Sequence, residues 1–495
     1  MSDFAQLVLG ADLQAQPVAQ DWRLANRHGL IAGATGTGKT VTLQHMAEAF
    51  SDAGVAVFAA DIKGDLCGLG AAGNPQGKVA ERIAGMPWLN HRPQSYPVTL
   101  WDINGASGHP LRTTISEMGP LLLGSLLELT DSQQAALYAA FKVADREGLL
   151  LLDLKDLKAL LNHLKDNPQL LGEDSALMTT GSSQALLRRL ATLEQQGAEA
   201  LFGEPALQLE DILHPTAEGR GRIHLLDASR LVHEAPKVYA TFLLWLLAEL
   251  FEQLPERGDA DKPLLALFFD EAHLLFAGTP KALQERLEQV VRLIRSKGVG
   301  VYFVTQSPAD LPDDVLAQLG LRVQHGLRAF TAKEQKSLRA VAEGFRPNPA
   351  FDSLAVLTEL GIGEALVGTL QDKGTPAMVQ RVLIAPPQSR IGPLSDAERR
   401  ALIAQSPLQG RYDQAVDRES AYEMLTARAR KGQAAEELPE KSTPAEESFG
   451  DKAGEFLGSV AGQALKSAMR QAANQIGRNL VRGLMGSLLG GSKRR

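Results

Sequence analysis

The sequence predicts an α/β fold in which helices cover both faces of a mostly parallel sheet, with an all-helical insertion and a flexible C-terminal tail. Short apolar runs alternate with helical patterns over residues 28–61 and again over residues 220–384. Such alternation is typical of parallel strands joined by crossover helices. Leucine-rich helical patterns fill residues 111–219, where β-branched runs are nearly absent. The insertion therefore divides the predicted sheet into two segments of sequence.

The first part of the predicted sheet surrounds a glycine-rich turn. Residues 8–27 form a short β-rich lead-in, and an apolar strand then enters the turn at residue 33. A helix follows the turn and ends near Gly54, because glycine favours a helix stop. The apolar run Val55–Asp61 predicts a buried parallel strand. The chain thus opens with a strand–loop–helix–strand unit.

The second part of the predicted sheet follows the insertion. Helices are expected at Pro236–Leu254 and Lys281–Lys297, the second of which Gly298 stops. Apolar runs bounded by turn residues predict the strands of this part. Strands are expected at Gly221–Ser229, Pro263–His273, Gly298–Pro308, Leu321–Phe330, Glu364–Leu370 and Ala377–Ile384.

Changes in composition mark the remaining boundaries. Thr130 followed by Gln133 predicts a helix capping box within the insertion. After residue 431 the chain is rich in Glu, Pro, Ser and Ala, which is typical of a disordered acidic linker. The expected segments are 1–110 and 220–390 as the two parts of the core, 111–219 as the helical insertion, 391–430 as a helical extension, 431–451 as the linker and 452–495 as a basic amphipathic tail.

Composition limits the classes of protein and compartment. The 495 residues are 44% apolar and 22% charged, as in an ordinary globular protein. A net charge of -7 argues against a surface that binds nucleic acid everywhere, although a local basic channel remains open. The single cysteine, Cys67, fits a reducing compartment. The N-terminus lacks the basic segment of a signal peptide, and the apolar run Thr241–Phe251 is too short for a bilayer. We therefore expect a cytoplasmic protein.

The glycine-rich turn is Gly33–Thr40, with the sequence GATGTGKT. Its glycines let backbone N–H groups point inward, and these donors form an anion cradle with the following helix N-terminus. Lys39 would supply a positive charge to the β- and γ-phosphates of ATP, and Thr40 a hydroxyl to Mg²⁺. The expected nucleotide-binding residues are Gly33, Ala34, Thr35, Gly36, Thr37, Gly38, Lys39, Thr40 and Val41.

Two acids end the apolar segment LLALFFDEAH. Asp270 is expected to orient Mg²⁺ from the strand beside the phosphate loop, and Glu271 to activate or position the attacking water. A solvated strand end is the alternative, because acids at a strand end need not have a chemical role. The phosphate loop upstream favours the catalytic interpretation.

Gln306 and Arg295 are two further candidates. Gln306 follows a strand expected next to the phosphate-loop strand, so its amide would reach the γ-phosphate or the water. A capped strand end is the alternative for this residue. Arg295 lies on a helix stripe away from the apolar face, from which an arginine finger would reach a neighbouring subunit's ATP site. The alternative is an exposed face with a Glu288–Arg292 pair.

Four segments, GATGTGKT, DIKGDL, LFFDEAH and RSKGVGVYFVTQSP, together resemble the HerA/FtsK branch of P-loop ATPases. Within that branch the chain is similar to bacterial HerA-helicase-like proteins of the YjgR type, over about residues 8–110 and 220–390. The resemblance implies a RecA-like P-loop NTPase core that uses ATP and Mg²⁺. It also implies a homo-oligomer, with a hexameric ring as one form, that moves along double-stranded DNA. Relatives in this branch drive conjugation and secretion.

The same resemblance bears on single residues. Arg295 occupies the position from which the family's arginine acts across the subunit interface. Asp61, Lys63 and Asp65 of DIKGD match a family signature, but the sequence gives them no physical role. The helical stretch 111–219 has no counterpart that can be mapped onto a HerA motor.

Three functions remain open at this stage. The motor signature implies an ATPase that translocates DNA. The basic tail 452–495 would suit an ATPase that acts on protein or peripherally at an anionic membrane surface, although a solubilising tail explains it equally well. The third function is a nucleotide-dependent scaffold. Glu271 argues against the scaffold, since a protein that only binds nucleotide has less use for a water-activating acid.

Overall fold

The structure is a computed structural model that describes residues 6–258, 260–276 and 281–436, with residues 282–283 and 431–436 described by their backbone alone. The predicted tail 452–495 and most of the predicted linker lie outside the described residues. The chain divides into two units, one up to Arg428 and one from Ala429 onward. The first unit contains the sheet and the helices around it.

Its centre is a sheet that comprises twelve strands in the described residues, in the order β2-β1-β14-β11-β10-β3-β9-β8-β4-β7-β5-β6. These strands are β1 (Gln6–Ala11), β2 (Pro17–Asp21), β3 (Gly29–Ala32), β4 (Ala56–Asp61), β5 (Val98–Asp102), β6 (His109–Pro110), β7 (Ile223–Asp227), β8 (Leu265–Phe269), β9 (Val299–Thr305), β10 (Leu321–His325), β11 (Glu364–Gly368) and β14 (Gln380–Ile384). Strands β12 (Leu370–Gln371) and β13 (Thr375–Pro376) form a separate small ladder.

Most of the sheet is parallel. From β10 to β6 each strand runs parallel to its neighbour, whereas β11, β14, β1 and β2 pair antiparallel along one side. The mostly parallel sheet predicted from the sequence is confirmed. Strands β5 and β6 were not predicted, because each is a short run within a long irregular stretch of chain.

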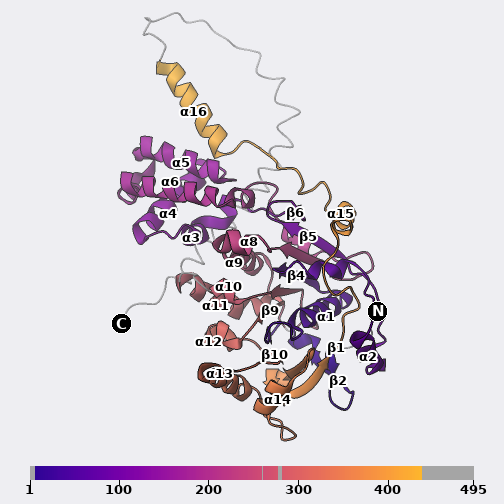
Figure 1. Ribbon diagram of the computed structural model, residues 1–495. Helices are drawn as coiled ribbons and strands as arrows, with labels where there is room; N and C mark the ends of the chain where they lie inside the picture. The colour runs from indigo at the N-terminus through magenta and orange to yellow at the C-terminus, as the bar shows by residue number, and fades with distance from the viewer. Residues whose placement is uncertain (1–5, 259, 277–280, 437–495) are drawn as a thin grey trace, which may run out of the picture. The chain divides into compact units, whose positions relative to one another are not determined.

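Helices cover both faces of the sheet, as Figure 1 shows. The side chains of each strand alternate between two cores, so that Val57 belongs to one core and Phe58 to the other. Helix α1 (Lys39–Asp52) packs on the first face, where Phe50 contacts the ring of Phe268. Helices α9 (Pro236–Gln253) and α11 (Lys281–Ile294) cover the second face. The central parallel strands β4, β8 and β9 are buried along their whole length, which explains their nearly continuous apolar runs.

The region between β6 and β7 is helical. It contains α3 (Ile115–Leu126), α4 (Asp131–Glu147), α5 (Leu154–Asp166), α6 (Thr180–Gln195) and α7 (Leu209–Leu213). The predicted capping box of Thr130 and Gln133 is present at the start of α4. Helix α9 is buried on nearly all sides because it lies between these helices and the sheet. None of the described helices is long and apolar enough to cross a membrane.

The remaining helices are short or lie at the edges of the sheet. They are α2 (Lys78–Ala84), α8 (Leu231–Glu234), α10 (His273–Phe276), α12 (Asp313–Leu316), α13 (Ala332–Glu343), α14 (Ser353–Glu359), α15 (Asp396–Ala404) and α16 (Ala421–Glu436). Helix α16 continues past residue 431, where the sequence predicted the linker to begin.

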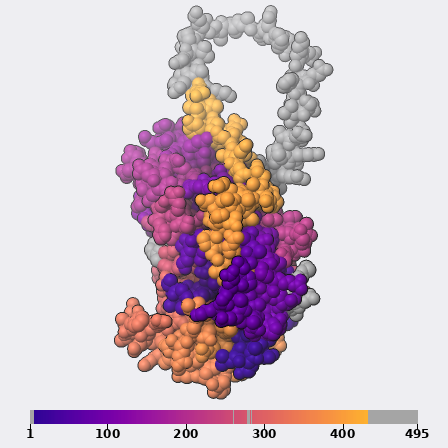
Figure 2. All heavy atoms as spheres, turned by 45° about the vertical axis from the view of Figure 1, so that its right-hand side comes forward, coloured from indigo at the N-terminus to yellow at the C-terminus, as the bar shows by residue number. Residues whose placement is uncertain are grey.

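The chain after β14, coloured orange in Figure 2, runs along the surface of the molecule toward the inserted helices. Arg399 pairs with Asp227 at the end of β7, with 3.0 Å between Nη1 and Oδ2. Farther along, Asp413 accepts a hydrogen bond from His109 of β6, and the hydroxyl of Ser420 bonds the buried Asp156 of α5. These contacts tie the segment to both the sheet and the insertion.

Candidate functional site

The phosphate loop joins β3 to α1 at the carboxyl edge of the sheet. Gly33 and Gly38 have φ angles of 154° and 116°, which L residues with side chains rarely adopt. A Cβ atom on Gly33 would lie 2.5 Å from Cβ of His325, and one on Gly38 would lie 3.2 Å from Cα of Gly363. Both positions therefore require glycine, and the loop keeps the open concave backbone that an anion needs.

Lys39 lies inside this loop. Its Nζ donates to the carbonyl oxygens of Gly33 and Ala34, at 2.6 and 3.1 Å, and only 5% of the residue is exposed. Burial lowers the pKa of Lys39, and the charge of Lys63 adds to this effect, while Glu271 and Asp270 oppose it. Lys39 is thus close enough to both acids after β8 to feel their charges.

The two acids lie at the same edge of the sheet as the loop, but not on the neighbouring strand. Strand β9 lies between β3 and β8, so the expectation that Asp270 extends from the strand beside the phosphate loop is wrong. Asp270 is buried, and burial raises its pKa to about 6, with Lys63 lowering it and Glu271 raising it. The Asp270 Oδ1 accepts a hydrogen bond of 2.9 Å from the N–H of Glu271.

Glu271 has an unusual backbone and an incompletely satisfied carboxylate. Its φ of 44° lies in the left-handed region, which costs a residue with a side chain about 1 kcal/mol or more. Oε1 lies 3.1 Å from Nζ of Lys63, and Oε2 lies 3.5 Å from Nδ1 of His273. Oε2 is buried and has no hydrogen-bond partner among the described residues. A buried acceptor without a partner is rare in folded proteins and fits a group that binds a ligand or a water.

The segment DIKGD after β4 acquires a physical role that the sequence did not reveal. Asp61 holds its turn, because Oδ1 accepts from the N–H of Gly64 at 2.8 Å and Oδ2 from the N–H of Leu66 at 3.1 Å. Burial raises the pKa of Asp61 to about 7, and Asp65 adds to the effect. The turn directs Lys63 toward the acids after β8, since β4 and β8 are neighbouring parallel strands.

His325 is a further residue that the sequence analysis missed. Its Nδ1 lies 2.9 Å from the carbonyl of Glu364 and must donate to it, so the neutral ring accepts at Nε2 from Thr42 Oγ1, 2.8 Å away. Burial lowers the pKa of His325 to about 4, and the charges of Lys39 and Arg82 add to this. Its Cα and Cβ atoms lie against Gly33, and its ring links α1 to β11. The available signal was its position at the end of a strand next to β3.

Gln306 and Arg295 lie beyond opposite ends of the central strand β9. Gln306 is exposed and directly follows Thr305, whose carbonyl accepts a 3.3 Å hydrogen bond from the N–H of Gly33. Strand β9 is the direct neighbour of β3, as the sequence predicted. Arg295 is exposed and precedes β9, and its carbonyl accepts from Asn26, which precedes β3. The seven residues of β9 span about 20 Å, so Arg295 lies far from the loop of its own chain.

The residues at the carboxyl edge fit a magnesium site in which the protein supplies only one or two of the ligands. In the described ranges, no group of three or more His, Cys, Asp or Glu residues is arranged to hold a metal ion. Mg²⁺ commonly keeps several waters and takes only one or two protein oxygens together with substrate phosphates. The half-buried Thr40 at the start of α1 and the buried Asp270 supply oxygens of the right kind.

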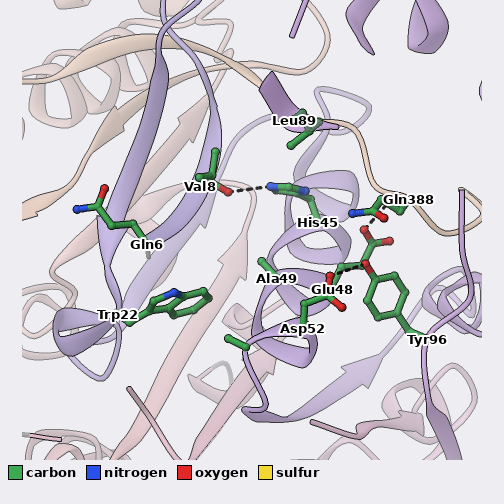
Figure 3. Close-up of a pocket in the computed structure, with 11 residues that line it drawn as sticks. Gln6, Val8, Trp22, His45, Glu48, Ala49, Asp52, Leu89, Tyr96 and Gln388 are labelled. Carbon is green, nitrogen blue, oxygen red and sulfur yellow. Dashed lines mark hydrogen bonds between the residues drawn. The ribbon is translucent and has the colours of Figure 1, made fainter. Parts of the chain in front are cut away.

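A separate small cavity lies along α1, beyond the loop, and is drawn in Figure 3. Its volume of about 60 Å³ has room for a few waters but not for a nucleotide. Glu48 accepts from the N–H groups of Gln388 and Ser389 at 2.8 and 2.9 Å, and Tyr96 donates to Asp52. These bonds fasten the phosphate-loop helix to the chain that follows β14 and to the chain just before β5, so we assign the cavity a structural role.

The chain is similar to known proteins in both sequence and structure. The family model described as helicase HerA-like C-terminal matches residues 6–495. The unbound bacterial conjugative coupling protein TrwBΔN70 is similar in structure, with a TM-score of 0.53 and 15% identity over 79% of this chain and 90% of that chain. TrwB in complex with the GTP analogue GDPNP has the same score and identity over 79% and 91%. VirB4 of Thermoanaerobacter pseudethanolicus has a TM-score of 0.47 and 17% identity over 80% and 98%. No curated protein sequence gives a significant match.

The likeness to TrwB shows a shared fold, because the identity is too low to carry more. A mostly parallel sheet with the phosphate loop after β3 and two acids after β8 is the RecA-like P-loop NTPase core that the sequence predicted. The match to the family model is a match of sequence, and it spans nearly the whole chain. The chain therefore belongs to the helicase HerA-like C-terminal family.

Proposed function

We propose that the protein hydrolyses ATP at the carboxyl edge of the sheet. The observation that carries the proposal is the convergence of Lys39, Asp270 and Glu271 on the glycine loop. Lys39 feels the charge of both acids, and the buried Oε2 of Glu271 has no hydrogen-bond partner among the described residues. An anion cradle alone would bind a nucleotide, whereas an acid held beside it can accept a proton from water.

The proposed roles follow from chemistry at each atom. The N–H groups of residues 33–41 and the Lys39 ammonium bind the phosphates. Glu271 orients the attacking water and accepts its proton, and the exposed amide of Gln306 reaches the γ-phosphate or that water. Thr40 and Asp270 would hold Mg²⁺, which supplies charge neutralisation between the β- and γ-phosphates when it is bound.

We infer that the active form is a homo-oligomer in which Arg295 acts on the site of a neighbouring subunit. The position of Arg295, across the sheet from its own loop, supports this inference, since the side chain cannot span about 20 Å. An arginine supplied in trans stabilises charge on the transferring phosphoryl group. The family resemblance favours a ring, and a hexamer is the form we expect.

For the substrate, we favour translocation of double-stranded DNA. The family and the similarity to a conjugative coupling protein support this choice. Action on a protein or at a membrane surface through residues 452–495 is the second candidate, because that segment is basic and helical in pattern. A nucleotide-dependent scaffold without turnover is the third.

The test is an ATPase assay in the presence of duplex DNA, single-stranded DNA, RNA or anionic liposomes, with the particle mass measured in parallel. Stimulation by duplex DNA that weakens as salt is raised supports the DNA motor, because phosphate contacts release counterions. A rate indifferent to every nucleic acid contradicts it. Stimulation by liposomes that is lost on deleting residues 452–495 favours the membrane candidate instead.

A further inference from the structure

An exposed isoleucine stands beside the phosphate loop. Ile362 lies in the turn Gly361–Gly363 before β11, and 74% of its surface is accessible to solvent. The N–H of Gly363 donates a 2.8 Å hydrogen bond to the carbonyl of Thr37. Gly38 comes so close to the same turn that a Cβ atom on it would lie 3.2 Å from Gly363. The turn is therefore in direct contact with the loop.

The direction of a bound nucleotide follows from the arrangement of the strands. In the proposed function, the γ-phosphate faces Glu271, which extends from β8. That acid lies on the β9 side of the loop strand β3, whereas β10 and β11 lie on the opposite side. Sugar and base extend from the other end of the triphosphate, past the N-terminus of α1. They consequently run toward the β10–β11 side, where Gly361–Gly363 lies.

Arg82 of α2 holds the turn at this place. Its Nη2 donates to the carbonyl of Ile362 at 2.9 Å. Gly363 has a φ of 76°, which favours glycine, and a Cβ atom on it would lie 2.2 Å from Nη1 of Arg82, so a side chain there would displace the guanidinium. No second hydrogen bond of this guanidinium is found within the described part of the chain. A guanidinium carries five N–H donors, which leaves donors for the oxygens of a ligand.

Glu364, the residue after the turn, also holds the turn in place. The carboxylate of Glu364 accepts from the N–H of Gly361 at 2.8 Å and pairs with Arg381, also at 2.8 Å. The carbonyl of Glu364 accepts from His325, which is bonded in turn to Thr42 of α1. The turn and the phosphate loop are thus parts of one hydrogen-bonded unit, and the exposed side chain is held in a defined place.

We propose that the turn Gly361–Gly363 and Arg82 form the subsite for the base and ribose of a nucleoside triphosphate. Ile362 supplies the apolar surface on which the base packs, and Arg82 supplies donors to ribose or α-phosphate oxygens. The proposal rests on the proposed function, since it takes the phosphates to lie on Gly33–Thr40. An aliphatic side chain excludes water from the flat face of a base without reading its edges. The subsite therefore accepts adenine and guanine alike.

The test compares ligands with and without a base. Binding of ATP, GTP and inorganic tripolyphosphate is measured by calorimetry for the full chain and for Ile362→Ala. The matched control is Ile391→Ala, because Ile391 is also exposed and lies outside the turn. Ile362→Ala is expected to weaken the binding of ATP and of GTP by about five- to tenfold, because part of an isoleucine contact is lost. The binding of tripolyphosphate should be unchanged. The control is expected to leave all three ligands unchanged.

Either of two results would overturn the proposed subsite. In the first, Ile362→Ala weakens the binding of tripolyphosphate as much as the binding of ATP. In the second, it does not weaken the binding of ATP. These outcomes are distinct from a failure of the proposed function. If the unaltered chain binds ATP without hydrolysing it, the proposed hydrolysis fails, while selective weakening of ATP and GTP still supports the subsite. If the unaltered chain binds neither ATP nor tripolyphosphate, both proposals fail together.

Discussion

The Nζ of Lys63 lies 3.1 Å from Oε1 of Glu271, so the turn after β4 holds the acid that follows β8. The two strands are parallel neighbours, which brings their carboxyl ends together. Burial opposes the charge of Lys63, but Asp270 and Glu271 raise its pKa overall, so the ammonium stays protonated. An ion pair in this position fixes one oxygen of Glu271, while the other, Oε2, has no hydrogen-bond partner among the described residues.

Replacing Lys63 should therefore slow turnover without weakening ATP binding. We expect Lys63→Ala to lower kcat roughly 10- to 100-fold, because a small misplacement of a catalytic group costs about that much. The KM for ATP should change little, since Lys63 contacts the acid and not the phosphate loop. Lys63→Arg keeps a cation within reach and should recover part of the rate. A steady-state analysis that finds KM raised and kcat unchanged would refute the positioning role.

The location of Arg295 leads to a prediction about mixed oligomers. Arg295→Ala should bind ATP and lose turnover, and Lys39→Ala should lose ATP binding, because each removes a different half of a shared site. Mixing the two inactive proteins should restore part of the activity, since some interfaces then combine an intact loop with an intact arginine.

Arg292→Ala is the control for this experiment, as Arg292 is an exposed arginine one turn earlier on α11. Arg292→Ala should retain full activity when it is assayed alone, and it should retain its activity when it is mixed with Lys39→Ala. If the mixture of Arg295→Ala and Lys39→Ala is as inactive as its components, at concentrations where the oligomer persists, the assignment of Arg295 is wrong.

The buried His28 predicts a dependence of stability on pH. Its Nε2 donates to the carbonyl of Val291 at 2.7 Å, and its Nδ1 accepts from the N–H of Val301 at 3.0 Å, which fixes a neutral ring. Burial lowers the pKa of His28 from 6.5 to about 4. Between these values the unfolded chain binds more protons than the folded one, so the free energy of unfolding decreases as pH falls from 6.5 to 4.

The contribution of this one histidine to that loss is about 3 kcal/mol, since each pKa unit is worth about 1.4 kcal/mol. Urea unfolding between pH 4 and 7.5 should show a shallower pH dependence for His28→Gln than for the unaltered protein. His233→Gln, at an exposed histidine, should leave the dependence unchanged. Identical pH profiles for His28→Gln and the unaltered chain would contradict the buried neutral state.

Features with a local signal could be predicted from the sequence, whereas features that depend on contacts between distant segments could not. Gly33, Lys39 and the strand and helix around them could be predicted, because strand, turn and helix are contiguous and each has a local signal. The pairing of Lys63 with Glu271 could not, since it depends on β4 and β8 being neighbours across some two hundred residues of sequence. The order of strands is a non-local property, which is also why β9 between β3 and β8 was missed.

His325 illustrates the same limit at the level of one side chain. A lone histidine at the end of an apolar run is more often a satisfied core residue than part of a site. Only the structure reveals that its Cβ atom lies against Gly33 and that its ring accepts from Thr42, which makes it a support of the phosphate loop. Residues whose role is to hold another residue leave little pattern in a single sequence.

In the proposed function, Glu271 converts a nucleotide-binding loop into a hydrolase, and Glu271→Gln is the decisive substitution. The amide keeps the size of the side chain but cannot accept a proton from water. ATP binding and single-turnover hydrolysis should be measured on the same preparation. We expect Glu271→Gln to bind ATP within a few-fold of the unaltered protein and to hydrolyse it more slowly by about 100-fold or more. Hydrolysis at the unaltered rate would contradict the proposed role of Glu271.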